Sequence, residues 1–268
     1  EEVIHEVTEC MKKWKEEGKP GGREGFLIRV AQIPGVYVPS FYEPTYQEDG
    51  TLREMKALRP EASLPIVKRV VKDLESLTSL TAPVVPFLVP VHDRINLEIF
   101  RGCTRGCRFC QAGIIYRPVR ERSPESLVKA AKEIAKNTGY DELSLMSLSS
   151  ADYSCLPELV DAILAEVEEQ KISVSLPSLR LDSFSVDLAE KVQKVRKSGL
   201  TFAPEAGTQR LRDVINKGVT SEDLETALSA AFGAGWNQVK LYFMIGLPTE
   251  TDKDIGGIIE TAAQVVGK

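Results

Sequence analysis

Three closely spaced cysteines are the feature of this sequence that most directly indicates chemistry. Cys103, Cys107 and Cys110 stand at the spacing CxxxCxxC. Three thiolates so spaced can hold three irons of a four-iron cluster, whereas full protein ligation takes four cysteines. The fourth iron would then lack a protein ligand, and an open coordination position distinguishes catalytic from structural metal sites. The triplet therefore predicts an iron–sulfur centre that takes part in a reaction.

Two plainer interpretations of the triplet have to be weighed. A disulfide is disfavoured, because the chain has 5 cysteines, an odd number, and a strand–helix pattern suited to a reducing compartment. A structural zinc site needs a fourth ligand. None of the remaining thiol and imidazole candidates stands at a zinc-finger spacing: His5, Cys10, His92 and Cys155. Metal analysis would separate the zinc and iron–sulfur alternatives.

Composition sets broad limits. The 268 residues suffice for one large or two small domains, and the formal charge of −5, from 34 basic and 39 acidic residues, gives no global reason for nucleic-acid binding. No apolar run reaches membrane-spanning length and no leader is visible, so we expect no membrane partner and a cytoplasmic protein. Six arginines crowd the cysteine loop. They form a solvated loop, pair with acids elsewhere, or face an anionic substrate or partner: Arg101, Arg105, Arg108, Arg117, Arg120 and Arg122.

The first third of the chain has an irregular pattern. We expect an amphipathic helix over residues 1–17, a short helix over Arg23–Gln32 and a hairpin around the Asp49–Gly50 turn. Pro65–Leu80 is expected to hold another short helix. The proline-rich stretch 82–90 cannot be a central strand, because proline does not donate to a ladder.

From Ile95 onward, apolar runs alternate with helical segments. The strands are expected at 95–100, 142–149, 172–179, 200–204 and 238–246. The helices are expected at 124–137, 156–170, 186–198, 208–216 with 221–234, and 252–266, and their starts carry Ser123-Pro124, Ser185, Ser221 and Thr251. Five strand–helix units imply an α/β fold with a parallel sheet and right-handed crossovers, most naturally a barrel or partial barrel.

The carboxyl ends of the predicted strands all carry polar or Gly/Pro residues. In parallel barrels the ligand site lies at this edge. The segments that follow the five strands are the cysteine loop, 147–153, 177–182, 203–207 and 245–250. This agreement is stronger evidence for a small-ligand site than any one motif.

These residues resemble the radical S-adenosylmethionine (SAM) superfamily over roughly 92–268. Phe109 precedes the last cysteine as the family's aromatic does. Pro204–Gly218 looks like the family's Glu-small-Gly-Ser/Thr segment ending in Asn-Lys-Gly, and Lys240–Thr251 looks like its fifth-strand segment. The resemblance implies a partial β/α barrel with five of six expected βα units, preceded by a helix and an irregular connector.

Within the superfamily, the chain is most similar to uncharacterised proteins with an N-terminal cobalamin-binding-like domain. Residues 1–17 would then be the last helix of that domain, 18–91 a connector, and 92–268 a core that is cut before its last unit. The start at Glu1 and a final helix without a clear terminus agree with a segment of a longer protein. The cobalamin-ligating Asp-x-His-x-x-Gly motif is absent, so cobalamin binding by this chain is unsupported.

The resemblance also implies a cofactor pair and a reaction. Cys103, Cys107 and Cys110 would bind a [4Fe–4S] cluster whose open iron chelates SAM. An electron donor such as flavodoxin or ferredoxin would drive reductive cleavage of SAM to methionine and a 5′-deoxyadenosyl radical. The substrate is not readable. The alternatives are a methyl- or methylthio-transferase acting on RNA or protein, and an electron-transfer module without SAM turnover.

Residues at several strand ends are implied as SAM contacts, each with a plainer alternative. Arg180 pairs either with the ligand or with Asp182 or Glu205. The serines depart from the family's usual Gly-Gly-Glu form, and the Gly-Leu-Pro segment is otherwise a tight turn. Cys155 is interpreted as a small apolar residue. The implied contacts are Phe109, Ser147, Ser149, Ser150, Arg180, Glu205, Gly246, Leu247 and Pro248.

Overall fold

The computed structural model divides the chain into two compact units, Glu1–Lys72 and Asp73–Lys268. It describes residues 2–77, 79–167, 170–176, 180–183, 186–192 and 199–267. The predicted strand end at 177–179, the capping Ser185, and the helix segments 168–169 and 193–198 lie outside the described residues. Among the helices that are described, none is long and apolar enough to cross a membrane.

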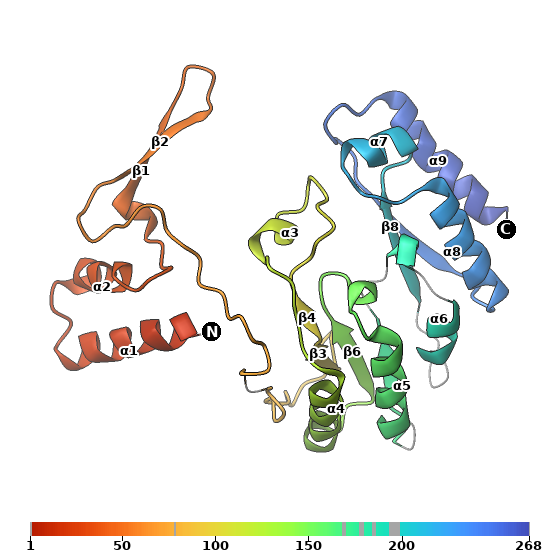
Figure 1. The fold of residues 1–268 in the computed structure, drawn as a ribbon, viewed down its shortest axis with the longest axis horizontal. Coiled ribbons are helices and arrows are strands. Elements are labelled where there is room, and N and C mark those ends of the chain that lie inside the picture. Colours follow the sequence, from red (N-terminus) through yellow and green to blue (C-terminus); the bar gives the residue numbers. More distant parts are fainter. Residues whose placement is uncertain are drawn as a thin grey trace. The chain divides into compact units, whose positions relative to one another are not determined.

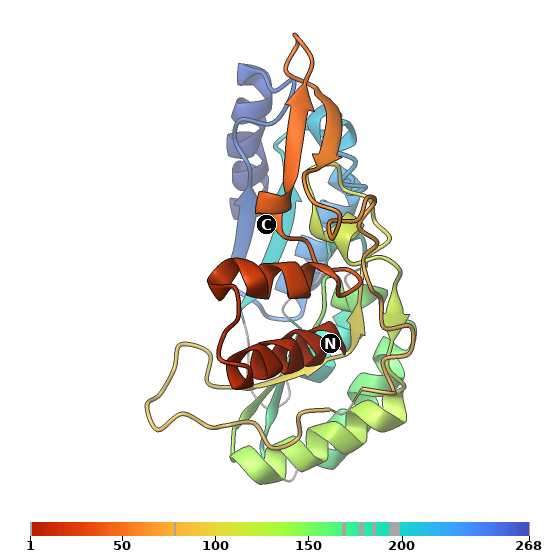
Figure 2. The same cartoon turned by 90° about the vertical axis from the view of Figure 1, so that its left-hand side faces the viewer.

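The first unit consists of two helices and a hairpin (Figures 1 and 2). The helices α1 (Glu2–Glu16) and α2 (Gly22–Ala31) are joined through Trp14 and Phe26, whose ring centroids are 5.4 Å apart. After the short turn η1 (Pro39–Phe41), strands β1 (Tyr42–Tyr46) and β2 (Leu52–Ala57) pair antiparallel. A small core of Ala31, Val38, Phe41, Tyr42 and Ala62 lies beneath them. The two predicted helices and the hairpin are confirmed.

The predicted short helix within Pro65–Leu80 is wrong. The described residues of this range form turns and bends, and from residue 65 to 77 only Leu74 is buried. A short helix is marginal in water unless packing stabilises one apolar face, and this segment presents no such face. Across 82–90 no strand forms, as its prolines require.

The second unit contains the five predicted strand–helix units. Strands β3 (Ile95–Glu98), β6 (Glu142–Met146) and β7 (Ser173–Ser175) form one parallel sheet in that order, and β8 (Leu200–Glu205) pairs parallel with β9 (Val239–Phe243). The helices are α4 (Pro124–Thr138), α5 (Leu156–Val167), α6 (Val186–Val192), α7 (Gln209–Val214), α8 (Ser221–Gly233) and α9 (Asp252–Val266). Ser123 caps α4, and Thr251 begins α9 as predicted.

The expectation of one continuous parallel sheet is corrected. Among the described residues, β7 and β8 are not hydrogen-bonded to each other, so the strands form two sheets and the partial barrel is not closed. The short length of β7 gives a reason, because a strand of 3 residues offers few backbone groups to a second neighbour. Figure 1 shows α4 and α5 beside the first sheet, and α8 and α9 beside the second.

Each sheet buries one side against its helices. Ile95, Leu97, Leu143 and Leu145 pack with apolar residues of α4 and α5. In β8 the burial alternates, so that Leu200 and Phe202 join the core with α8 whereas Thr201, Ala203 and Glu205 are less buried. Since successive side chains of a strand point to opposite faces, the latter three share the face away from the helices.

A small ribbon that the sequence did not predict closes the cysteine loop. Strands β4 (Phe100–Arg101) and β5 (Arg120–Glu121) pair antiparallel, and the short helix α3 (Ala112–Ile115) lies between them. Gly102 follows β4 with φ +98°, and a Cβ there would lie 2.8 Å from the carbonyl oxygen of Tyr116. Only glycine suits both this conformation and this close approach.

Candidate functional site

The three cysteines lie in a cavity of about 330 Å³ in the second unit. Its walls come from the loop after β4, the end of β6, the inward face of β8, and β9. The site is therefore at the carboxyl ends of the strands, where the sequence predicted it. The lining residues are Cys103, Arg105, Cys107, Phe109, Cys110, Leu148, Ser149, Arg180, Thr201, Ala203, Glu205, Lys217 and Tyr242.

The cysteine loop is fixed against the turn that follows α7. The backbone N–H of Arg108 donates to the carbonyl of Ile215 at 2.9 Å, and the Asn216 amide donates to the carbonyl of Gly106, also at 2.9 Å. The Cys110 N–H donates to the carbonyl of Cys107 at 3.0 Å. The loop thus has a defined backbone path between its first and last cysteine.

The donor set suits an iron–sulfur cluster. All three sulfurs belong to free, partly exposed thiols that line one cavity. Within the part of the chain that the structure describes, no three His, Cys, Asp or Glu side chains converge on a single metal ion. A cluster makes a different demand, since each thiolate binds its own iron.

Glu205 lines the cavity at the point where β8 is distorted. The β8–β9 register shifts between Phe202 and Glu205, and a bulge of this kind can re-aim a side chain. Glu205 has φ +68°, a left-handed conformation that residues other than glycine seldom adopt. Such strained residues concentrate at functional sites.

Lys217 is a site residue that the sequence reasoning missed. Its Nζ lies 3.0 Å from Oε1 of Glu205, and the two side chains are only 10% and 15% exposed. The same Nζ lies 5.9 Å from the ring centroid of Phe109. The Asn-Lys-Gly signal was visible in the sequence, but only the folded turn shows that its lysine enters the cavity.

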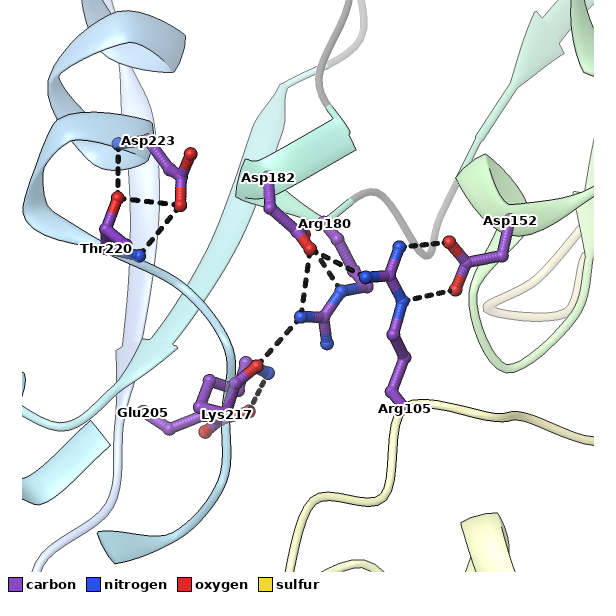
Figure 3. A network of polar contacts seen from close by, with 8 residues as sticks. All are labelled: Arg105, Asp152, Arg180, Asp182, Glu205, Lys217, Thr220 and Asp223. Carbon is purple, nitrogen blue, oxygen red and sulfur yellow. Dashed lines mark hydrogen bonds and ion pairs between the residues drawn. The ribbon is translucent and has the colours of Figure 1, made fainter. Parts of the chain in front are cut away.

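Arg180 is held by protein groups. It makes two contacts with Asp182, of 2.9 and 3.3 Å, and its Nη2 donates to the carbonyl of Lys217 at 2.8 Å (Figure 3). This geometry is the ion pair with Asp182 that was one of the two predicted alternatives. The side chain also lines the cavity, so it remains near any bound ligand.

The predicted serines fall into two groups. Ser149 lines the cavity. The hydroxyls of Ser147 and Ser150 instead lie 3.0 Å from each other, and Ser150 donates to the carbonyl of Leu145. These contacts shape the turn after β6, and direct contacts of Ser147 and Ser150 with SAM remain a prediction.

The predicted adenine-binding segment forms a turn outside the group of cavity-lining residues. The Gly246 N–H donates to the Glu250 carboxylate at 2.6 Å, and Leu247 packs on the small apolar cluster of Ala206, Leu211 and Ile215. Contacts of Gly246, Leu247 and Pro248 with SAM therefore remain a prediction. Cys155 packs against the core of the first sheet.

Several arginines around the loop make contacts within the protein. Arg101 forms a two-pronged pair with Glu98 at 2.7 and 2.8 Å. Arg105 pairs with Asp152 and Asp182. Arg122 is buried and donates to the carbonyl of Leu77. Arg101 and Arg105 follow the predicted alternative in which the arginines pair with acids, whereas Arg122 contacts a backbone carbonyl.

Comparison with known proteins agrees with this geometry. The profile of the Radical SAM superfamily matches residues 97–262. An uncharacterized protein of Methanocaldococcus jannaschii is 39% identical over 63% of this chain and 36% of its own length. A tRNA-2-methylthio-N(6)-dimethylallyladenosine synthase of Staphylococcus epidermidis is 22% identical over 60% of this chain and 33% of its own length. The chain therefore spans about a third of these relatives.

Solved structures share the fold. The radical S-adenosylmethionine methyltransferase TsrM from Kitasatospora setae, with cobalamin and a [4Fe–4S] cluster bound, superposes with a TM-score of 0.58. The alignment covers 92% of this chain and 49% of TsrM at 16% identity. At this identity the likeness concerns the fold alone, and it supports a mixed α/β radical SAM architecture.

Proposed function

Since the chain belongs to the radical SAM superfamily of enzymes, we propose that its cavity holds a [4Fe–4S] cluster on Cys103, Cys107 and Cys110, with SAM beside it. The observation that carries the proposal is the shared cavity, which joins three free thiols to a buried carboxylate and a buried ammonium. A ligand that bears both a carboxylate and an ammonium group is complementary to such a pair.

The residues of the cavity suit the parts of SAM. Lys217 presents a cation to the carboxylate of the ligand, and Glu205 presents an acceptor to its ammonium group or ribose hydroxyls. Because Glu205 and Lys217 already pair with each other, neither charge is left uncompensated in the free protein. Phe109, Leu148 and Tyr242 supply apolar surface for the adenosyl group.

A cluster held by Cys103, Cys107 and Cys110 would supply the electron for reductive cleavage of SAM to methionine and a 5′-deoxyadenosyl radical. The chain's own contribution is to orient the ligand and to limit access of water. An external one-electron donor such as flavodoxin or ferredoxin would reduce the cluster.

A second candidate is transfer of a methyl or methylthio group to RNA or protein. It is favoured by the relatives, one of which is named as a tRNA methylthio synthase and another as a methyltransferase. Both reactions would use the same cavity, so the cavity does not distinguish them. Their products do. Methyl transfer would leave S-adenosylhomocysteine and reductive cleavage 5′-deoxyadenosine. Methylthio transfer, which replaces a C–H bond and also adds a methyl group, would leave both.

Product analysis tests the proposal. Anaerobically reconstituted protein, a chemical reductant and SAM are incubated, and both nucleosides are quantified by mass spectrometry. We expect 5′-deoxyadenosine from the native chain and none from Cys107→Ala. A chain that carries a cluster but yields neither nucleoside above the no-protein background would favour an electron-transfer module and contradict SAM turnover.

A further inference from the structure

One arginine of the cysteine loop reaches both neighbouring strand ends. Arg105 lies between Cys103 and Cys107, and its Nε donates to Asp152 at 2.8 Å while Nη2 donates to the other oxygen of the same carboxylate. Its Nη1 donates to Asp182 at 2.9 Å. Asp152 belongs to η2 (Ser150–Asp152) after β6, and Asp182 to η3 (Leu181–Ser183) after β7. Figure 3 shows the guanidinium between the two acids.

Asp182 connects Arg105 to the part of the cavity where SAM is proposed to bind. It also accepts from Arg180, which donates to the carbonyl of Lys217, and Lys217 pairs with Glu205. The chain of contacts thus runs from the cysteine loop to Glu205 (Figure 3). Arg105 follows the first sheet. Leu181, next to Asp182 in η3, packs in the core of the second sheet with Phe202, and Lys217 and Glu205 belong to that same side. Between β7 and β8, the described residues show no backbone pairing that would join the two sheets.

The network holds one cation, Arg105, between two carboxylates, Asp152 and Asp182. Burial raises the pKa of Asp152, but the hydrogen bonds and the charge of Arg105 lower it, and the net result is below the ordinary value. A two-pronged guanidinium–carboxylate contact also fixes direction, which a lysine in the same place does less well.

We infer that Arg105 is a positioning residue. Through Asp152 and Asp182 it fixes the Cys103–Cys107 segment relative to Glu205 and Lys217, so that cluster and SAM are held in register. The inference rests on the proposed function. It extends that function by assigning a role to three residues that bind neither cofactor, because partners that orient ligand-bearing segments commonly affect metal retention.

The test compares Arg105→Ala, Arg105→Lys and Asp182→Asn with Thr104→Ala, an exposed neighbour in the same loop. After anaerobic reconstitution, iron loss to a chelator is timed and the electron paramagnetic resonance spectrum of the reduced cluster is recorded with and without SAM. We expect Arg105→Ala to lose iron roughly 10- to 100-fold faster and to show a diminished spectral response to SAM. Arg105→Lys should recover part of both, Asp182→Asn should weaken mainly the response to SAM, and Thr104→Ala should behave as the native protein.

Native iron retention and a native SAM response in Arg105→Ala would overturn the inference. If Arg105→Ala does not fold, Arg105→Lys and Asp152→Asn decide, and native values in both would overturn it equally. If the spectrum of the native protein does not change when SAM is added, the proposed function itself is contradicted. The two failures are therefore distinguishable.

Discussion

Glu205 combines three properties that seldom occur together in one residue. It is a carboxylate, it is mostly buried beside Lys217, and it adopts a left-handed backbone conformation at a bulge in β8. Left-handed conformations cost non-glycine residues on the order of 1–2 kcal/mol. The fold tolerates this cost where it directs the carboxylate into the cavity.

Replacing Glu205 by alanine should weaken SAM binding. The expected loss is roughly 1.5–3 kcal/mol, the range for hydrogen bonds to charged groups, and it is measured by calorimetry on cluster-loaded protein. Glu222→Ala, an exposed carboxylate of α8, serves as the control. Unchanged affinity in Glu205→Ala would remove this residue from the site.

At the level of single residues, the sequence predicted the residues that belong to short sequence motifs. The cysteines were predicted from their spacing, and Glu205 from the resemblance of Pro204–Gly218 to a family segment. Lys217 could not be predicted as a cavity residue from the sequence. Its position depends on the turn after α7, which folds back onto the cysteine loop. Arg105 was noticed only as part of a basic cluster, and its two acidic partners lie 47 and 77 residues away in the sequence.

At the scale of the elements, the segment after β8 contacts α9 so closely that position 207 has no room for a side chain. A Cβ on Gly207 would lie 2.4 Å from the backbone nitrogen of Ile258 and 2.5 Å from the carbonyl oxygen of Asp254. The loop that carries Glu205 is thereby placed against α9. The contact therefore links helix packing to the shape of the cavity.

Substituting Gly207 by alanine should separate the loop from α9. We expect a loss of about 1–3 kcal/mol in the free energy of unfolding, as for overpacked cores, together with weaker SAM binding. Chemical denaturation and calorimetry measure the two effects. Gly233→Ala is the control, because no atom lies within 4 Å of its added Cβ, and it should change the stability by less than about 1 kcal/mol. Equal stabilities in the two variants would show that the contact is looser than the structure indicates.

The start of α9 depends on a buried carboxylate. Hydrogen bonds from Arg210, Thr208 and Thr251 hold the pKa of Asp254 below its ordinary value, and its side chain is 2% exposed. A lowered folded-state pKa stabilises the protein above the unfolded-state pKa, near 3.9. That contribution is lost as the pH falls through the folded-state value.

Asp254→Asn should therefore unfold at a lower temperature than the native protein at pH 7. The difference should shrink as the pH falls below about 4, where the unfolded-state carboxyl becomes protonated. Thermal unfolding followed by circular dichroism across this range measures it. The exposed Asp252→Asn on the same helix is the control. A difference that grows on acidification would contradict the assigned pKa direction.

Element prediction succeeded where periodicity is strong. The strands and helices of the second unit follow their apolar patterns, and α9 has the predicted bounds. The β4–β5 ribbon was missed because strands of 2 residues carry no periodic signal. The helix predicted within Pro65–Leu80 did not form because, from residue 65 to 77, only Leu74 is buried, which is too little packing to stabilise a short helix.

At the scale of the whole molecule, the second unit joins two parallel sheets around one cavity. Strand order and the number of units follow from the sequence, but the break between β7 and β8 depends on pairing between distant residues. Across that break, the cysteine loop, Asp182, Arg180 and Lys217 make side-chain contacts instead. Every strand–helix unit thus contributes residues to the cavity. The central claim is that the three cysteines in it bind an iron–sulfur cluster.

Iron analysis tests that claim most directly. After anaerobic reconstitution, the native chain should carry about four irons and four sulfides. Cys103→Ala, Cys107→Ala and Cys110→Ala should each lose the cluster, whereas Cys10→Ala and Cys155→Ala should keep it, since neither lines the cavity. Full iron loading in Cys107→Ala, or stoichiometric zinc in the native protein, would contradict the account.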